Sequence, residues 1–180
     1  MIRYSIISVF VLMACHCLVN GQSRDYPVVK GLAGDLFSIG ELTYEDKLDN
    51  QDTFLSDWVV QMNDQGNFER YAKIIDGKLE VLDPAGCTIW LKRKLSGPVC
   101  ICYRVIVSSE RDTSNIIVPR DINNFWLAGE AGKLGNILDS KRYRGKFPDY
   151  HEMQGYYGFR MTHTFHKYYD FKVYKLDKLQ

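Results

Sequence analysis

The C-terminal stretch GYYGFRMTHTFHKYYDFKVYKL, residues 155–176, decides the fold class. Aromatic or apolar residues alternate with polar residues on both sides of a turn-like centre, which is typical of strands that each bury one face. We expect one strand near residues 156–161, then a turn, and a second strand near residues 168–176. This pattern predicts the closing strand pair of a β-sandwich.

The same period of two runs through the sequence that precedes this pair. Asp76-Gly77 is a hairpin turn signal between two strand-like runs, and further strands are expected in ELTYED (41–46), DWVVQM (57–62), CTIWLKRKL (87–95) and VCICYRVIV (99–107). The last run is almost continuously apolar, which favours a central strand buried on both faces. Only residues 133–140 are expected to form a short helix. Short strands separated by turn signals predict an all-β sandwich or barrel.

Composition indicates one ordinary globular domain. The chain has 180 residues, of which 46% are hydrophobic and 25% are charged. Arg3 is the one Lys, Arg, Asp or Glu among the first 21 residues, so the remainder carries 22 basic and 22 acidic residues. This balance gives no electrostatic reason to expect nucleic acid or an anionic membrane as a partner.

The first 21 residues resemble a secretory signal peptide. Arg3 precedes an apolar run over residues 4–14, which is too short to span a bilayer. Two ends are compatible with the sequence: cleavage after Gly21, or a lipoprotein signal in which Cys15 becomes the lipidated first residue. We expect a secreted, periplasmic or lipid-anchored surface protein, with an irregular arm over residues 22–40 and a sandwich domain over residues 41–180.

Three cysteines follow the expected leader: Cys87, Cys100 and Cys102. Cys100 and Cys102 lie on one face of the expected strand, where neighbours two residues apart are not normally bridged. We expect the thiols to behave as small apolar side chains. No grouping of Cys and His has the spacing of a zinc site, so neither a metal nor a cofactor is expected.

A set of motifs in a fixed order resembles a secreted bacterial domain family of unknown function within the concanavalin A-like lectin/glucanase superfamily. The resemblance covers most of residues 41–176 and rests on these segments: LTYEDKL, DWVVQM, DGKLEV, PAGCTIWLKRKLSGPVCICYRV, RDINNFW, GKFPDY and GYYGFR…YYDFKVYKL. Relatives in that superfamily include polysaccharide lyases, glucanases and keto-disaccharide hydrolases. The resemblance implies a jelly-roll sandwich that acts on carbohydrate.

The resemblance also implies that this chain is internally shortened. In the family, a long central portion separates GKFPDY from the closing strand pair, and here it is missing between residues 153 and 155. An incomplete sandwich would expose strand edges and favour homo-oligomers. The alternative is a compact variant in which Tyr156 and Tyr157 pair directly into the gap.

The motif RDINNFW, residues 120–126, is the first candidate site. On a strand, Asp121, Asn123 and Phe125 share one face, and Ile122, Asn124 and Trp126 share the other. Sugars require planar polar partners for their hydroxyls and rings for their apolar face. We expect a sugar cleft lined by Arg120, Asp121, Asn123 and Trp126. The alternative is that the polar residues satisfy loop backbone while Trp126 fills the core.

The motif KRYRGKFPDYHE, residues 141–152, is the second candidate. Abstraction of the proton next to a uronate carboxylate needs a cation to stabilise the enediolate and a base. Arg144 is the candidate charge stabiliser and Tyr150 or His151 the candidate base, which would suit a lyase acting on an acidic polysaccharide. The alternative is a solvated basic loop. The E-x-D-x-x-E pattern of the glucanase relatives is absent, which disfavours hydrolysis by a carboxylate pair.

The sequence therefore favours a secreted carbohydrate-active domain that recognises a polysaccharide or oligosaccharide, with lyase-like or hydrolase-like cleavage as its enzymatic form. Two alternatives stay open: a non-catalytic carbohydrate-binding module, and a truncated, inactive family member.

Overall fold

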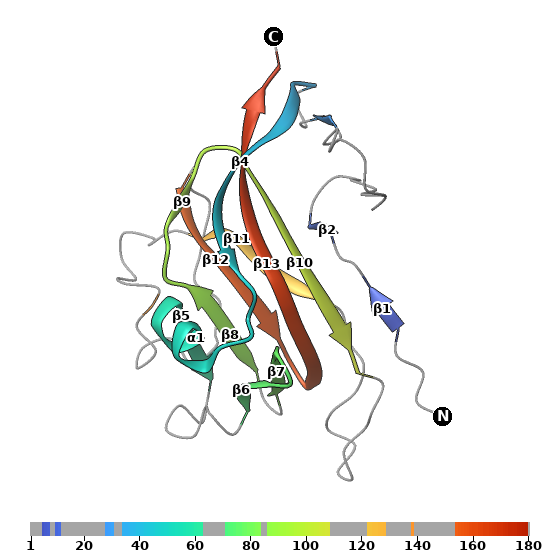
Figure 1. Ribbon diagram of the computed structural model, residues 1–180, viewed down its shortest axis with the longest axis vertical. Helices are drawn as coiled ribbons and strands as arrows, with labels where there is room; N and C mark the ends of the chain where they lie inside the picture. The colour runs from blue at the N-terminus through green and yellow to red at the C-terminus, as the bar shows by residue number, and fades with distance from the viewer. Residues whose placement is uncertain are drawn as a thin grey trace.

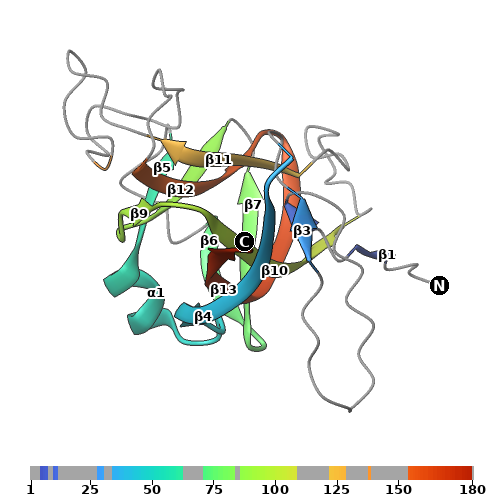
Figure 2. The ribbon, with the colours of Figure 1, turned by 90° about the horizontal axis from the view of Figure 1, so that it is seen from above.

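The chain folds into an all-β sandwich of two antiparallel sheets, which confirms the predicted fold class (Figures 1 and 2). The computed structural model describes residues 5–7, 10–11, 28–30, 34–62, 71–83, 86–108, 122–128, 138 and 154–179. Within that part of the chain, no helix is long and apolar enough to cross a membrane. Seen from above, β11 and β12 run through one layer while β4 and β10 run through the other (Figure 2).

The larger sheet has eight strands among the described residues. They are β1 (Ser5–Ile7), β2 (Phe10–Val11), β3 (Val29–Lys30), β4 (Leu36–Asp46), β6 (Ala72–Ile75), β7 (Lys78–Asp83), β10 (Val99–Val107) and β13 (Thr164–Lys178). Strands β6 and β7 form the expected hairpin, and both residues of its Asp76-Gly77 turn have positive φ. A two-residue turn of this kind matches the twist of the strands that it joins.

Strand β13 holds the larger sheet together. Along one edge it pairs with β10; along the other, its first half pairs with β7 and its second half with β4 (Figure 1). Tyr168 and Phe171 are both fully buried although they are three positions apart in the sequence, a spacing that a regular strand would place on opposite faces. A bulge opposite Tyr103, with Asp170 at φ 54°, supplies the extra residue and returns Phe171 to the core.

The smaller sheet has five strands among the described residues. They are β5 (Trp58–Met62), β8 (Cys87–Leu91), β9 (Leu95–Ser96), β11 (Asn123–Ala128) and β12 (Gln154–Met161). Strand β12 lies between β11 and β8, so both of its edges are paired. Tyr156 and Tyr157 thus lie in a strand that is paired on both edges. Whether the chain is internally shortened or a compact variant stays a prediction.

An aromatic core fills the space between the two sheets. Trp58 of β5 stacks on Phe159 of β12, with ring centroids 5.5 Å apart, and meets the edge of Phe171 of β13 at 5.0 Å. Tyr103 of β10 also contacts the edge of Phe159, at 5.0 Å. These rings come from both sheets and are almost completely buried, so their contacts join the sheets.

A short helix that the sequence analysis missed, α1 (Gln51–Asp57), precedes β5. The Asn50 side chain caps it by accepting a hydrogen bond from the Thr53 N–H at 2.9 Å, and Asp52 lies in the first turn. Phe54 anchors the helix in the core, and the chain becomes extended at Trp58. The expected helix at 133–140 lies outside the described residues except for Leu138.

Two further expectations differ from the structure. Strand β4 begins at Leu36 and β3 covers Val29–Lys30, so parts of the expected irregular arm over 22–40 belong to the larger sheet. Strand β10 is not buried on both faces: Ile101, Tyr103 and Val105 face the core, whereas Arg104 is exposed. On its other edge β10 pairs with β1 and β2, which lie in the segment expected to be a signal peptide.

Candidate functional site

The outer face of the smaller sheet carries two side-chain rows that cross its strands in direct register. The polar row consists of Gln61 of β5, Thr88 of β8, Arg160 of β12 and Asn123 of β11. The apolar row lies two positions away on each strand and consists of Val59, Trp90, Gly158 and Phe125. Alternate residues of these strands face the core, so the pleat directs both rows away from it. We call this surface the outer face.

Two stacked rings form the centre of the apolar row. The rings of Trp90 and Phe125 lie 5.2 Å apart with an interplanar angle of 20°. Gly158 lies between them, and a Cβ atom built there would be 2.6 Å from the indole, so the tryptophan ring occupies the space above a glycine backbone. Trp90 and Phe125 form a hydrophobic cluster with Ala128, and Leu138 and Tyr156 pack against it.

The polar row is linked to the rings and becomes more exposed toward β11. The Trp90 indole N–H donates to Gln61 Oε1 at 2.9 Å, so the two rows are joined by a buried hydrogen bond. Gln61 and Thr88 are fully buried, Arg160 is half-buried and Asn123 is exposed. Solvent therefore reaches this row from its Asn123 end.

Two members of the polar row have well-defined surroundings. Arg160 Nη1 donates to the carbonyls of Cys87, at 3.0 Å, and Met161, which fixes the guanidinium over the sheet. Among the described residues, no hydrogen-bond partner lies near the buried Thr88 hydroxyl. A buried hydroxyl without a partner is costly, and such groups are often found where a ligand or water is bound.

This arrangement suits hydrogen bonding to a polyhydroxylated ligand more than it suits hydrolysis. The polar row offers two amides, one hydroxyl and one guanidinium beside two aromatic rings, but no carboxylate. Glycoside hydrolysis normally requires two carboxyl groups that flank the bond to be cleaved. Within the described part of the chain there is also no group of three or more side chains arranged to hold a metal ion.

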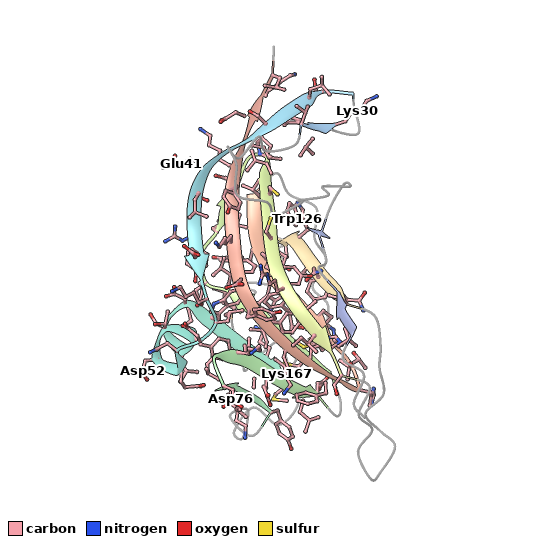
Figure 3. The ribbon with its side chains drawn as sticks, turned by 45° about the vertical axis from the view of Figure 1, so that its right-hand side comes forward. Lys30, Glu41, Asp52, Asp76, Trp126 and Lys167 are labelled. Atoms are coloured by element: carbon pink, nitrogen blue, oxygen red, sulfur yellow. The ribbon has the colours of Figure 1, made fainter. Side chains whose placement is uncertain are left out.

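The structure describes two of the sequence-predicted site residues and places them on opposite faces of β11. Asn123 belongs to the polar row on the outer face. Trp126 faces the core, where it meets the ring of Tyr157 edge-on at 6.3 Å with an interplanar angle of 88° (Figure 3). The strand therefore does not bring the two side chains onto one surface. The other candidates, Arg120, Asp121, Arg144, Tyr150, His151 and Cys15, lie outside the described residues.

Asn124, which the sequence analysis placed on the Trp126 face, connects the two sheets. Its Nδ2 donates to the hydroxyl of Tyr103 at 2.9 Å, and its Oδ1 accepts a hydrogen bond from the Tyr157 hydroxyl at 2.6 Å. Burial raises the pKa of Tyr103 to about 12 and raises that of Tyr157 well above the usual tyrosine value. Both phenols therefore stay protonated at neutral pH, and Asn124 has a structural role.

A second location, the hollow beside α1, is lined by Tyr44, Ser56, Asp57, Leu91, Lys92 and Arg93 and has a volume of about 310 Å³. The Tyr44 hydroxyl donates to Asp57 Oδ2 at 2.9 Å, and the Arg93 guanidinium lies 5.0 Å from the ring centre of Tyr44. Burial and the hydrogen bond to Asp57 raise the pKa of Tyr44 far above its usual value. Tyr44 is therefore a hydrogen-bond donor here rather than a base.

Sequence reasoning missed Gln61, Thr88 and Arg160 as members of one row. The alternation in CTIWL places Thr88 and Trp90 on a single face of β8, and that signal was available. Their alignment with β5 and β12 depends on strand pairing between segments far apart in the sequence, which the period of two does not encode.

Comparison with known proteins bears on the family and not on the activity. No curated protein matches the chain, and no solved structure matches it. Residues 81–172, which run from β7 to β13 and include three of the four strands that carry the outer face, match the family described as Domain of unknown function (DUF6250). This match spans half of the chain, and the chain therefore belongs to the DUF6250 family.

Proposed function

We propose that the domain recognises carbohydrate through the outer face of its smaller sheet. One observation carries the proposal: a row of amide, hydroxyl and guanidinium groups lies in register beside the stacked rings of Trp90 and Phe125. Planar polar groups satisfy sugar hydroxyls. The rings of Trp90 and Phe125 are buried, so they support the row from beneath instead of contacting the ligand. Asn123, predicted from the sequence as a sugar ligand, is the exposed member of this row.

Arg160 favours an acidic sugar over a neutral one. Its guanidinium is a permanent positive charge that the carbonyls of Cys87 and Met161 hold in place next to the exposed Asn123. A uronate carboxylate bound at this end of the row would accept charge-assisted hydrogen bonds from it. We therefore propose an acidic polysaccharide or oligosaccharide as the ligand class.

The finer features of the proposal come from the sequence, and the first of them from its resemblance to a family. They are a jelly-roll arrangement of concanavalin A-like type, export through the N-terminal leader, and cleavage by Arg144 with Tyr150 or His151. The geometry supports recognition, because the row can bind but contains no base. Cleavage is the enzymatic form of the hypothesis and predicts new unsaturated uronate ends, which would be lost in Tyr150→Phe or His151→Ala.

The test is binding of the purified chain to a panel of neutral and uronate-containing oligosaccharides, measured by isothermal titration calorimetry. We expect saturable binding of at least one acidic glycan, weakened about tenfold by Asn123→Ala through the loss of a hydrogen bond. Two variants are controls. Glu41→Ala changes a side chain on β4 of the other sheet that is likewise exposed (Figure 3), and Arg93→Ala changes the hollow beside α1. Both should bind as the unmodified chain does.

Each contrary outcome identifies what is wrong. A loss confined to Arg93→Ala would move the site to the hollow. Full affinity in Asn123→Ala would remove the polar row from the proposal. Absence of binding across the whole panel would contradict carbohydrate recognition and favour the truncated, inactive alternative.

A further inference from the structure

Two cysteines of β10 lie side by side on the outer side of the larger sheet, away from the proposed sugar site. Cys100 and Cys102 alternate with the buried Ile101 and Tyr103, so both thiols point away from the core, and each is half-buried. Their Sγ atoms lie 3.7 Å apart, within the range of an S–H···S hydrogen bond. The pair therefore consists of two thiols in direct contact on a side of the sheet that solvent reaches.

This contact makes one thiol of the pair more acidic. The hydrogen bond from Cys102 lowers the pKa of Cys100, because it stabilises the Cys100 thiolate, and partial burial opposes this effect only in part. The thiolate is the form of cysteine that attacks disulfides. At neutral pH, Cys100 therefore carries more of the reactive form than an ordinary thiol does.

Cys87 has the opposite properties. Its thiol is fully buried in β8, and burial, together with the negative charge of Asp83, raises its pKa well above the usual cysteine value. A buried thiol of this kind stays protonated and does not react with solutes. The fold therefore gives its described cysteines different access to solvent and different acidity, and it favours reaction at Cys100 over reaction at Cys87.

Strand geometry keeps Cys100 and Cys102 from forming a relaxed disulfide with each other. An antiparallel strand rises about 3.4 Å per residue, so Cα atoms two residues apart are separated by nearly 7 Å, at the upper limit of the range that disulfides span. The ladder with β13 holds β10 in this extended form, since Cys100 pairs with Tyr174 and Cys102 with Lys172. A disulfide between Cys100 and a small external thiol requires no contraction of the strand.

We propose that Cys100 is a site of reversible S-thiolation, at which the chain forms a mixed disulfide with a low-molecular-weight thiol. The Cys100 thiolate attacks one sulfur of a low-molecular-weight disulfide; a new S–S bond forms to that sulfur, and the original S–S bond breaks. The second sulfur leaves as a thiolate and takes up the proton that Cys100 released. One disulfide replaces another, so the reaction requires no further oxidant. Because Cys102 does not close onto Cys100, the mixed disulfide persists until an external thiol removes it.

The experiment exposes the folded full-length chain to oxidised glutathione at neutral pH and identifies the products by intact-mass and peptide mass spectrometry after acid quenching. Cys15 and Cys17 are replaced by Ser so that three thiols are left. We expect one glutathione per chain, attached at Cys100 and released by dithiothreitol. Absence of an adduct, or an adduct mainly at another cysteine, would overturn the proposal. A product that has lost two hydrogens and carries no glutathione would be a Cys100–Cys102 disulfide and would also overturn it.

Two matched variants test whether the contact with Cys102 activates Cys100. Cys102→Ala removes the hydrogen-bond donor, whereas Cys102→Ser keeps a donor and removes only the second thiol. We expect Cys102→Ala to react about threefold more slowly at pH 7, because the smaller thiolate fraction outweighs the greater nucleophilicity of a less acidic thiol. The midpoint of its pH–rate profile should also shift to higher pH, while Cys102→Ser reacts nearly as fast as the unmodified chain.

Circular dichroism checks that each variant is folded. A rate and a pH–rate midpoint that Cys102→Ala leaves unchanged would overturn the proposal, because Cys100 would then react as an ordinary half-buried thiol. Equal slowing in Cys102→Ala and Cys102→Ser would overturn the role of the hydrogen bond.

Discussion

Gly158 is the residue on which the apolar row depends. A Cβ atom at this position would lie 2.6 Å from Trp90 Cε3 and 2.9 Å from Cζ3, closer than van der Waals contact allows. We expect Gly158→Ala to lower the free energy of unfolding by about 2 kcal/mol, because the fully buried indole must move within a packed site. Chemical denaturation of the purified variant measures this loss.

A double-mutant cycle ties that loss to the indole. Trp90→Phe removes part of the ring that a new methyl group would meet, so Gly158→Ala/Trp90→Phe should be about 1 kcal/mol more stable than the sum of the single losses predicts. Additive losses would show that the methyl group is accommodated without contact with Trp90.

At the scale of single residues, the sequence predicts what is local. Asp76 and Gly77 specify a turn by their own backbone preferences, and the turn is where the sequence places it. Asn123 and Trp126 show what the sequence does not predict. Alternation predicts which face of β11 each side chain occupies, but it does not predict which residues of other strands lie beside it. The Tyr168–Phe171 spacing breaks the alternation, and only the partner strand shows that a bulge at Asp170 restores it.

Helix α1 depends on its N-terminal cap. Asn50→Ala removes the acceptor of the Thr53 N–H, and we expect a loss of about 1 kcal/mol in the free energy of unfolding. Asn50→Asp keeps a side-chain oxygen at the cap and serves as the control, with nearly full stability in thermal or chemical unfolding. Equal losses in the two variants would show that the cap does not stabilise the domain.

The alternation of apolar and polar residues predicts the strands better than it predicts the helix. The closing pair is where alternation indicates it, with β12 and β13 somewhat longer than expected. Helix α1 was missed because its seven residues are too few to show a helical period, although Asn50 with Asp52 two residues later is a recognisable start signal. The apolar run of β10 suggested burial on both faces because Cys100 and Cys102 count as apolar residues while they face outward.

The whole molecule is predicted to lose stability at alkaline pH because tyrosines fill its core. Tyr103, Tyr157 and Tyr168 are buried between the sheets, and burial raises the pKa of Tyr103 to about 12 and the other two well above 10.0. In the unfolded chain the same phenols ionise near pH 10. Above that pH the unfolded state carries fewer protons than the folded state, so the stability present below pH 10 decreases as pH rises.

The size of this effect follows from the number of phenols. Each protonated tyrosine contributes a slope of about 1.4 kcal/mol per pH unit once the unfolded chain is ionised. Urea denaturation at a series of pH values between about 10 and 11 measures the slope, and Tyr103→Phe should reduce it by about one proton while its loss at neutral pH is recorded separately. A slope that Tyr103→Phe leaves unchanged would contradict the assignment of Tyr103 to this effect.

The central position of β13 determines when the domain can form. Every other described strand precedes β13 along the chain, yet β13 is the partner of β4, β7 and β10; Thr43 and the carbonyl of Val173, which share a hydrogen bond, are 130 residues apart in the sequence. During synthesis on the ribosome, β4, β7 and β10 are made before β13 and stay without this common partner until it has been synthesised. Strands that are far apart in the sequence pair slowly. Until they pair with β13, the earlier strands expose edges to which other chains can bind. The protein should therefore fold only after translation has passed residue 178, and until then it is a natural client for a holding chaperone.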